Sequence, residues 1–220
     1  HAEAIGARLW VTGRDFGFAG DQNQWAFWLA GGSRRGGLAY PALRGTNQRL
    51  NASAVMAACE AVRDILPVTI QAIRQGLMLV ELPGRFQVLP GRPTVVLDVA
   101  HNPQAAGVLN ENLASMGFFS ETWAVLGMLG DKDVAGVVRL LRDRVDHWLL
   151  ASLPGPRGLS AARLAEILRE LGVSGDVSEH DSPRAAYQVA RDGAAEGDRI
   201  VIFGSFLTVA DVLAAVKAPQ

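Results

Sequence analysis

The stretch that decides the fold is the segment Thr94-Val95-Val96-Leu97-Asp98-Val99-Ala100-His101-Asn102-Pro103. Its first half is an apolar run without alternation, which is typical of a strand covered on both faces. Its last two residues suit the start of a helix, because asparagine is a preferred N-cap and proline a preferred first helical residue. We therefore predict a buried strand over 94–99 that turns directly into a helix over 103–116.

The chain beyond this stretch repeats the same alternation. The apolar pattern predicts further strands at 123–128, at 148–151, near Val177 and at 199–203, and helices at 134–141, at 160–171, from 183 and over 206–216. This order is typical of an α/β fold, with a Rossmann-like, mostly parallel sheet and helices on both faces joined by right-handed crossovers. Such sheets bind ligands beyond the carboxyl ends of their strands, so the loops after Val99, Met128, Ala151 and Phe203 are the candidate site.

The amino-terminal part has a different pattern. We predict short strands at 8–12 and 24–29, a glycine-rich hairpin loop at 31–37, and helices at 51–66 and 69–79. The first of these helices carries an expected apolar stripe of Val55, Ala58, Val62 and Ile65. The segment 82–93 then contains three prolines and two Pro-Gly pairs, which a helix interior does not accept. We place a domain boundary there, giving domains over 1–82 and 83–220.

The composition excludes several classes of protein. The chain has 220 residues, of which 49% are hydrophobic and 20% charged, as in an ordinary globular protein and unlike a disordered, collagen-like or coiled-coil chain. No apolar run approaches the length of a transmembrane helix, and 21 basic against 22 acidic residues give no basic footprint. We therefore expect neither a membrane nor a nucleic acid as partner. The single cysteine, Cys59, cannot form an internal disulfide, which favours a cytoplasmic location.

Two residues of the deciding stretch are not explained by the fold. An ionised Asp98 at the end of a buried strand costs free energy unless it is paired or faces a ligand. His101 stands beside a predicted helix N-terminus, where anions bind. The structural alternative is that Asp98 accepts from loop amides and that His101 is an exposed loop residue. Both interpretations stay open at this point.

Five segments, in this order, resemble the folylpolyglutamate synthase/dihydrofolate synthase family, a branch of the Mur ligase group. They are Gln48-Arg49-Leu50-Asn51-Ala52, Leu82-Pro83-Gly84-Arg85-Phe86, residues 98–103, residues 126–133 and Phe203-Gly204-Ser205-Phe206. The resemblance covers most of the chain and is least distinctive over residues 1–40. It implies the carboxyl-terminal portion of a bifunctional folate ligase.

The resemblance also implies a reaction, in which ATP converts a substrate carboxylate into an acyl phosphate and the amine of L-glutamate then displaces phosphate. The small molecules implied are ATP with Mg²⁺, L-glutamate, and dihydropteroate or a reduced folate. Carried over by motif, Asn51, Arg85 and Asp98 would hold ATP: Arg85 at the phosphates, Asn51 through its amide, and Asp98 at the ribose. His101 is the candidate for the phosphate or acyl-phosphate region, and Lys132 a weaker candidate in the same cleft.

Several parts that this chemistry needs are absent from the sequence. There is no Gly-x-x-x-x-Gly-Lys-[Ser/Thr] phosphate loop, and no cluster of Cys and His has metal-ligand spacing. The resemblance thus implies that residues 1–82 are the tail end of a P-loop-type ATPase domain. The phosphate loop and the Mg²⁺ ligands would then lie upstream, in the rest of its own chain, and this fragment alone would be inactive.

Alternative interpretations remain. The function could be that of a Mur-type peptidoglycan-precursor ligase, or of a stand-alone Rossmann-like binding module without catalysis. A nicotinamide or flavin oxidoreductase is disfavoured, because no Gly-x-Gly-x-x-Gly follows a strand. For single residues, Asn51 could cap its helix, Arg85 could be a solvated turn residue, Lys132 a solvated loop charge and Ser205 a helix N-cap.

Overall fold

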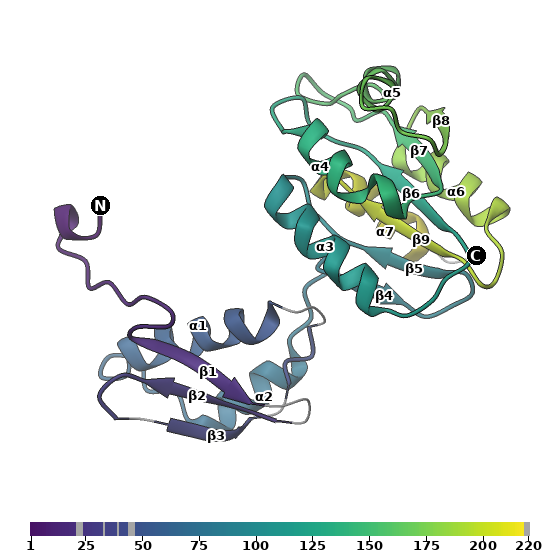
Figure 1. Ribbon diagram of the computed structural model, residues 1–220. Coiled ribbons are helices and arrows are strands. Elements are labelled where there is room, and N and C mark those ends of the chain that lie inside the picture. The colour runs from purple at the N-terminus through teal and green to yellow at the C-terminus, as the bar shows by residue number, and fades with distance from the viewer. Residues whose placement is uncertain (21–23, 33, 39, 44–46, 218–220) are drawn as a thin grey trace. The chain divides into compact units, whose positions relative to one another are not determined.

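The computed structural model describes residues 1–20, 24–32, 34–38, 40–43 and 47–217. Within it the chain divides into two compact units, residues 1–81 and residues 82–220 (Figure 1). None of the described helices is long and apolar enough to cross a membrane.

The unit of residues 1–81 is a small antiparallel sheet covered by two helices. Its strands are β1 (Phe16–Gly20), β2 (Trp25–Leu29) and β3 (Arg34–Leu38), in the order β1-β2-β3. A short 3₁₀ turn (Glu3–Ile5) precedes them, and α1 (Gln48–Ala61) and α2 (Ile70–Leu79) follow. Trp25 and Phe27 of the central strand are almost completely buried and, with Met56 of α1, form the core of this unit.

The predictions for residues 1–81 were partly wrong. The expected strand at 8–12 is absent apart from a bridge at Thr12, and β1 follows it instead. Residues 34–37 of the expected hairpin loop belong to strand β3, while Ser33 lies outside the described residues. The helix predicted over 51–66 runs over 48–61. The helix predicted over 69–79 runs over 70–79, and Thr69 is its N-cap.

The expected stripe on α1 is also wrong. The helix buries its small residues, Ala52, Ser53 and Ala57, together with Met56, while Val55 stays exposed. Small side chains let the helix backbone approach the sheet closely, so the face with the smaller residues packs against it.

The unit of residues 82–220 confirms the predicted α/β fold with a mostly parallel sheet. Six strands lie in the order β4-β5-β9-β6-β7-β8, and only β4 is antiparallel to its neighbour. The strands are β4 (Gln87–Leu89), β5 (Thr94–Leu97), β6 (Thr122–Leu126), β7 (His147–Ala151), β8 (Asp176–His180) and β9 (Arg199–Phe203).

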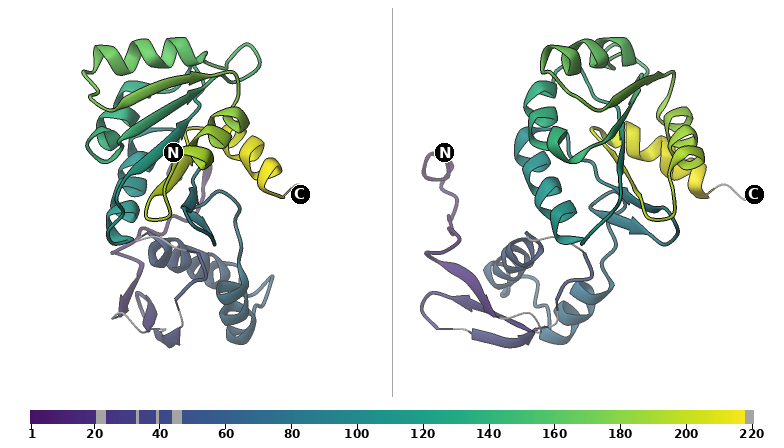
Figure 2. Two further views of the ribbon diagram at one scale, coloured as in Figure 1. Left: turned by 90° about the vertical axis from the view of Figure 1, so that its right-hand side faces the viewer. Right: turned by 45° about the vertical axis from the view of Figure 1, so that its right-hand side comes forward.

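Helices cover both faces of this sheet, as Figure 2 shows in its right-hand view. They are α3 (Pro103–Ser115), α4 (Val134–Leu141), α5 (Ala161–Glu170), α6 (Pro183–Gly193) and α7 (Phe206–Lys217), with a 3₁₀ turn at Arg142–Arg144. The apolar side chains of α3, α4 and α5 belong to one buried cluster, and those of α6 and α7 to another. At the start of α3, Asn102 accepts from the Ala105 N–H and Pro103 occupies the first turn, as predicted.

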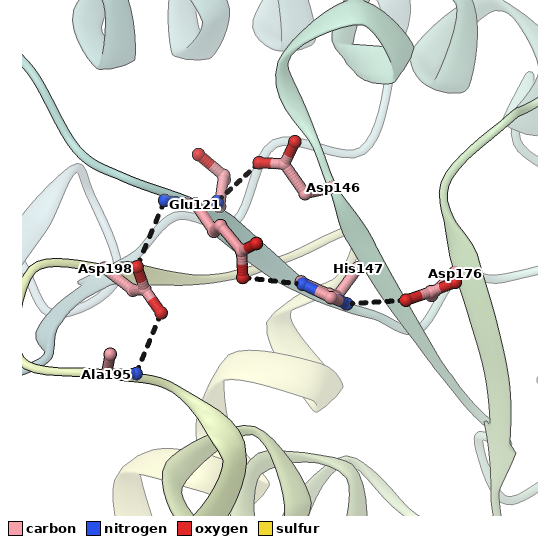
Figure 3. Close-up of polar contacts among 7 residues, drawn as sticks. Glu121, Asp146, His147, Asp176, Ala195 and Asp198 are labelled. Carbon is pink, nitrogen blue, oxygen red and sulfur yellow. Dashed lines mark hydrogen bonds and ion pairs between the residues drawn. The ribbon is translucent and has the colours of Figure 1, made fainter.

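At the amino ends of the parallel strands, carboxylates accept hydrogen bonds from the backbone (Figure 3). Asp198, which is 4% exposed, accepts from the backbone N–H groups of Glu121 (3.1 Å) and Ala195 (2.8 Å). Asp146 accepts from the backbone N–H of Thr122 at 2.8 Å. Both carboxylates satisfy backbone donors at the edge of the sheet, where the strand ladder no longer supplies a partner.

A histidine joins three strands at the same edge. His147 Nε2 lies 2.9 Å from a carboxylate oxygen of Glu121, and Nδ1 lies 3.3 Å from one of Asp176. The imidazole stacks on Trp123 with ring centroids 3.9 Å apart. The starts of β6, β7 and β8 are therefore linked by side chains as well as by backbone hydrogen bonds (Figure 3).

Arg199 is a buried cation at the start of β9. It donates to Thr122 Oγ1 (2.9 Å) and to the carbonyl of Leu113 at the end of α3 (2.7 Å), and it lies over the ring of Phe119. Burial, assisted by the nearby charge of Arg144, lowers the pKa of Arg199 to about 10. Its hydrogen bonds thus serve the fold.

Candidate functional site

A pocket of about 160 Å³ opens at the carboxyl edge of the six-stranded sheet. Its wall is formed by His101, Leu129, Lys132, Arg157, Gly204, Ser205 and Phe206. These residues follow β5, β6, β7 and β9, so the four loops that the topology rule indicated all contribute. Pockets at this edge are the usual ligand sites of open parallel sheets.

Backbone hydrogen bonds fix these loops against one another. The Gly130 N–H donates to the Arg157 carbonyl at 2.8 Å, which joins the loop after β6 to the loop after β7. The Gly204 N–H donates to the Ala100 carbonyl at 3.0 Å, which joins the turn after β9 to the turn after β5. The pocket wall is therefore largely formed before any ligand arrives.

Gly204 is required by the turn from β9 into α7. Its φ is +107°, and a Cβ at this position would lie 2.5 Å from the Gly127 carbonyl oxygen. Only glycine allows this close approach of two backbones. Ser205 follows as the predicted N-cap, and its Oγ accepts from the Leu207 N–H at 3.1 Å. The N-terminus of α7 consequently faces the pocket with backbone donors, a setting that favours anions.

Two cations share a single carboxylate beside the pocket. Lys132 Nζ lies 3.3 Å from Asp131, and Arg157 Nε lies 4.0 Å from the same carboxylate. The side chain of Lys132 is 31% exposed and that of Arg157 is 66% exposed. Because one negative charge faces two positive ones, the pocket carries a positive excess that suits an anionic solute.

His101 forms part of the pocket wall, and neighbouring groups hold its imidazole ring in place. Its Nδ1 lies 2.8 Å from the Val99 carbonyl oxygen, and its ring centroid lies 6.2 Å from that of Phe206. The sequence placed His101 and Lys132 in one cleft, and the structure brings both to the wall of one pocket.

Arg85 and Asp98 form a second polar group beside the pocket. The backbone around Arg85 is held by Gly84 (φ +73°) and Phe86 (φ +44°), a conformation that non-glycine residues seldom adopt. Asp98 stabilises it by accepting from the Phe86 N–H at 2.9 Å and from the Ala100 N–H at 2.8 Å. The structural role considered for Asp98, acceptance of hydrogen bonds from loop amides, is therefore present in the fold.

The charges of this group affect each other. Burial raises the pKa of the Asp98 carboxyl above its usual value, against the opposing effect of the Ala100 and Phe86 N–H groups and of the Arg85 charge. Arg85 is exposed, and its guanidinium carbon lies 5.7 Å from the centre of the Phe206 ring. Phe206, itself 56% exposed, thus lies beside both Arg85 and His101.

Asn51 belongs to the other unit, residues 1–81. It is exposed in the first turn of α1, and its Nδ2 donates to Gln48 Oε1 at 3.3 Å. The N-cap position of this helix is Asn47. The alternative prediction, that Asn51 caps the helix, is therefore wrong.

Arg157 and Phe206 are pocket residues that the sequence did not single out as ligand contacts. Arg157 stands between Pro156 and Gly158 in a loop without a recognisable motif. The one signal that could have found it is its place after a buried parallel strand, in a loop that the topology rule indicated. Among the described residues, no group of three His, Cys, Asp or Glu side chains could hold a metal ion.

A family model described as Mur ligase, glutamate ligase domain, matches residues 84–206. Among curated proteins, the chain is 36% identical over 217 residues to the dihydrofolate synthase/folylpolyglutamate synthase of Escherichia coli, covering 99% of this chain and 48% of that protein. It is 33% identical over 185 residues to the protein of the same name from Mycobacterium tuberculosis, covering 77% of this chain and 38% of the relative. The chain thus spans about half or less of the length of these relatives.

Solved structures give the same picture. E. coli FolC in complex with DHPP and ADP is similar with a TM-score of 0.85 and 36% identity, over 98% of this chain and 49% of that one. A bifunctional folylpolyglutamate synthase/dihydrofolate synthase with Mn, AMPPNP and L-glutamate bound is similar with a TM-score of 0.84 and 39% identity, over 99% of this chain and 50% of that one.

Proposed function

The chain belongs to the Mur ligase family, whose glutamate ligase domain spans residues 84–206, and on this premise we propose that it is part of an ATP-dependent folate ligase. The reaction is the addition of L-glutamate to dihydropteroate, to a folyl-glutamate, or to both, through an acyl phosphate. The observation that carries the proposal is the positively charged pocket at the carboxyl edge of the sheet, in a chain that matches folate ligases over almost its whole length.

L-glutamate is the ligand proposed for this pocket. Lys132 and Arg157 offer charged donors, and the N-terminus of α7 offers backbone N–H groups, so two carboxylates can be held at once. A relative that is 39% identical to this chain is described with L-glutamate bound. Because L-glutamate carries two carboxylates where most amino acids carry one, the pocket's positive excess favours an acidic amino acid.

Arg85 and Asp98 are proposed to contact the nucleotide from the same unit. Both Asp98 oxygens already accept one backbone N–H each, yet a carboxylate oxygen can accept a second hydrogen bond, such as one from a ribose hydroxyl. Arg85 is exposed and held over Phe206, so its guanidinium can contact phosphate oxygens. Asn51 is proposed to contact ATP from the unit of residues 1–81, through an amide that is exposed on α1.

ATP supplies the phosphoryl group that turns a carboxylate into a displaceable group. The described residues offer no three-ligand site for Mg²⁺. We propose that residues 1–82 are the carboxyl-terminal part of an ATP-binding domain and 83–220 a Mur-ligase-type carboxyl-terminal domain. The phosphate loop would then be supplied by other parts of the natural protein, and this chain alone would form no amide.

The pocket assignment is tested by calorimetric titration of the 220-residue chain with L-glutamate and with L-glutamine. L-glutamine keeps the amine and the α-carboxylate but lacks the second negative charge. We expect L-glutamate to bind at least about tenfold more tightly, the value of one charge-assisted contact. Equal affinities, or no binding of L-glutamate, would overturn the assignment.

A further inference from the structure

Thr208 is a fully buried polar residue in the first turn of α7, and its hydroxyl reaches another element. Its Oγ1 donates to the Gly127 carbonyl oxygen at 2.7 Å, across 81 residues of sequence. A threonine hydroxyl in a helix commonly bonds to the carbonyl one turn earlier or faces solvent. Thr208 instead joins α7 to the end of β6, because Gly127 follows the last residue of that strand.

The buried residue Gly127 is bonded on one side to β9 and on the other to α7. Its N–H donates to the Phe203 carbonyl of β9 at 3.4 Å, while its carbonyl accepts from Thr208. A Cβ on Gly127 would lie 2.6 Å from Thr208 Oγ1, and one on Gly204 would lie 2.5 Å from the Gly127 carbonyl oxygen. Because a buried carbonyl needs a donor, the Thr208 hydroxyl fixes the orientation of this tightly enclosed peptide group.

The chain runs from Gly127 directly into the two loops that carry the cations of the pocket. The next carbonyl along the chain accepts from the Leu159 N–H at 3.1 Å, and the Gly130 N–H donates to the Arg157 carbonyl at 2.8 Å. The loop after β6, which contains Lys132, is therefore bonded to the loop after β7. A change in the Gly127 peptide would move Lys132 and Arg157 together, relative to the N-terminus of α7.

We propose that Thr208 is a positioning residue whose hydroxyl sets the spacing between the N-terminus of α7 and the loops that carry Lys132 and Arg157. This inference rests on the proposed function, in which these two kinds of donor hold the two carboxylates of one amino acid. Donors at a fixed spacing select ligands by length, because a ligand must reach both at once. Thr208, which is not part of the pocket wall, thereby sets the preference for L-glutamate over L-aspartate, which is one methylene shorter.

The test is calorimetric titration of the 220-residue chain and its variants with L-glutamate and with L-aspartate. Thr208→Val keeps the shape of the side chain and removes the hydroxyl, while Thr208→Ser keeps the hydroxyl and removes a methyl group. We expect Thr208→Val to weaken L-glutamate about tenfold, the value of one charge-assisted contact, and L-aspartate less than about twofold. The shorter ligand changes less because it contacts one kind of donor at a time. Thr208→Ser should keep the preference of the unsubstituted chain.

The two variants control for each other. Both alter a buried side chain and should lose stability, so stability alone does not explain a change in binding that one of them shows. Thr122→Val is the same substitution at the amino edge, where Thr122 Oγ1 accepts from Arg199, and it should leave both affinities unchanged.

The outcomes separate this inference from the proposal beneath it. If Thr208→Val weakens both ligands equally or neither, or if Thr208→Ser loses the preference as well, the inference fails while the pocket assignment stands. Equal affinities of the unsubstituted chain for the two ligands also overturn the inference alone. If that chain does not bind L-glutamate, the pocket assignment fails and the inference falls with it.

A second measurement does not depend on how a variant folds. In the unsubstituted chain, the buried hydroxyl proton of Thr208 should exchange with water slowly enough to be observed by proton NMR. L-glutamate at ten times its Kd should slow this exchange about tenfold, because a ligand that bridges α7 and the two loops opposes their separation. The Ala195 amide at the amino edge should exchange at an unchanged rate. A hydroxyl in fast exchange, or one whose exchange L-glutamate does not slow, would contradict the proposal.

Discussion

The two edges of the six-stranded sheet carry the same types of side chain in different roles. At the amino edge, Asp198, Asp146 and His147 each contact backbone or side-chain groups of neighbouring strands (Figure 3). At the carboxyl edge, Lys132, Arg157 and Nε2 of His101 surround a pocket and retain hydrogen-bonding capacity. A polar residue at a strand end is thus a candidate for function when the fold has not already used its hydrogen bonds.

The largest expected effect is loss of stability at the amino edge. Replacing the buried Asp198 with alanine removes two charge-assisted hydrogen bonds, from the N–H groups of Glu121 and Ala195, which should cost about 2–4 kcal/mol in the free energy of unfolding. Urea unfolding measures this, with the exposed Asp143→Ala as the matched control. L-glutamate affinity should not change, and a loss of binding would break the distinction between the two edges.

The reverse pattern is expected at the carboxyl edge. Lys132→Met should weaken L-glutamate about tenfold in calorimetry, because a charged donor to a carboxylate is lost. The free energy of unfolding should stay within about 0.5 kcal/mol, since the ion pair of Lys132 with Asp131 is partly exposed. Arg169→Met removes a cation outside the pocket and serves as the control. A destabilised variant with intact binding would show that Lys132 serves the fold.

His147 provides a smaller test of the amino edge. His147→Phe keeps an aromatic ring against Trp123 but loses both carboxylate contacts, so it should cost up to about 1 kcal/mol of stability in urea unfolding. L-glutamate affinity should not change, because His147 does not belong to the pocket wall. A loss of L-glutamate binding in this variant would remove the distinction between the two edges.

The smallest effect on stability is expected at Asp98. This residue lies at the carboxyl edge, but its carboxylate already accepts hydrogen bonds that stabilise the fold. Burial raises its pKa in the folded state, so the folded chain keeps a proton that the unfolded chain has already lost. The free energy of unfolding should therefore fall as pH rises from the usual aspartate value of 3.8 through the raised one. Urea unfolding at a series of pH values measures this dependence. The Asp98→Asn variant should lack the part of the pH dependence that Asp98 contributes. An identical pH dependence in both proteins would contradict a raised pKa of Asp98 in the folded state.

The sequence predicted the α/β unit well because its signals are local. Each buried parallel strand is a short apolar run, and each helix carries a stripe such as Val134, Val137, Val138 and Leu141, all of which are buried. The small sheet was harder to predict. Strand β1 contains two glycines within Phe16–Gly20, and α1 packs through its small side chains, so neither follows the usual pattern.

The site was predictable only in part. Motifs indicated His101 and Lys132, and the topology rule indicated the loop that contains Arg157 without selecting the residue. What the sequence could not supply is which hydrogen bonds are already used. The double acceptance by Asp98 and the Nδ1 contact of His101 depend on backbone turns whose conformation appears only in the folded chain.

The most direct test of the central claim is a titration of the isotopically labelled chain with L-glutamate, followed by backbone amide NMR. The account predicts saturable shifts at residues 100–101, 129–132, 157–158 and 204–206, around the pocket. Shifts centred on residues 121, 146–147 and 198 at the opposite edge, or no saturable shifts at all, would contradict it.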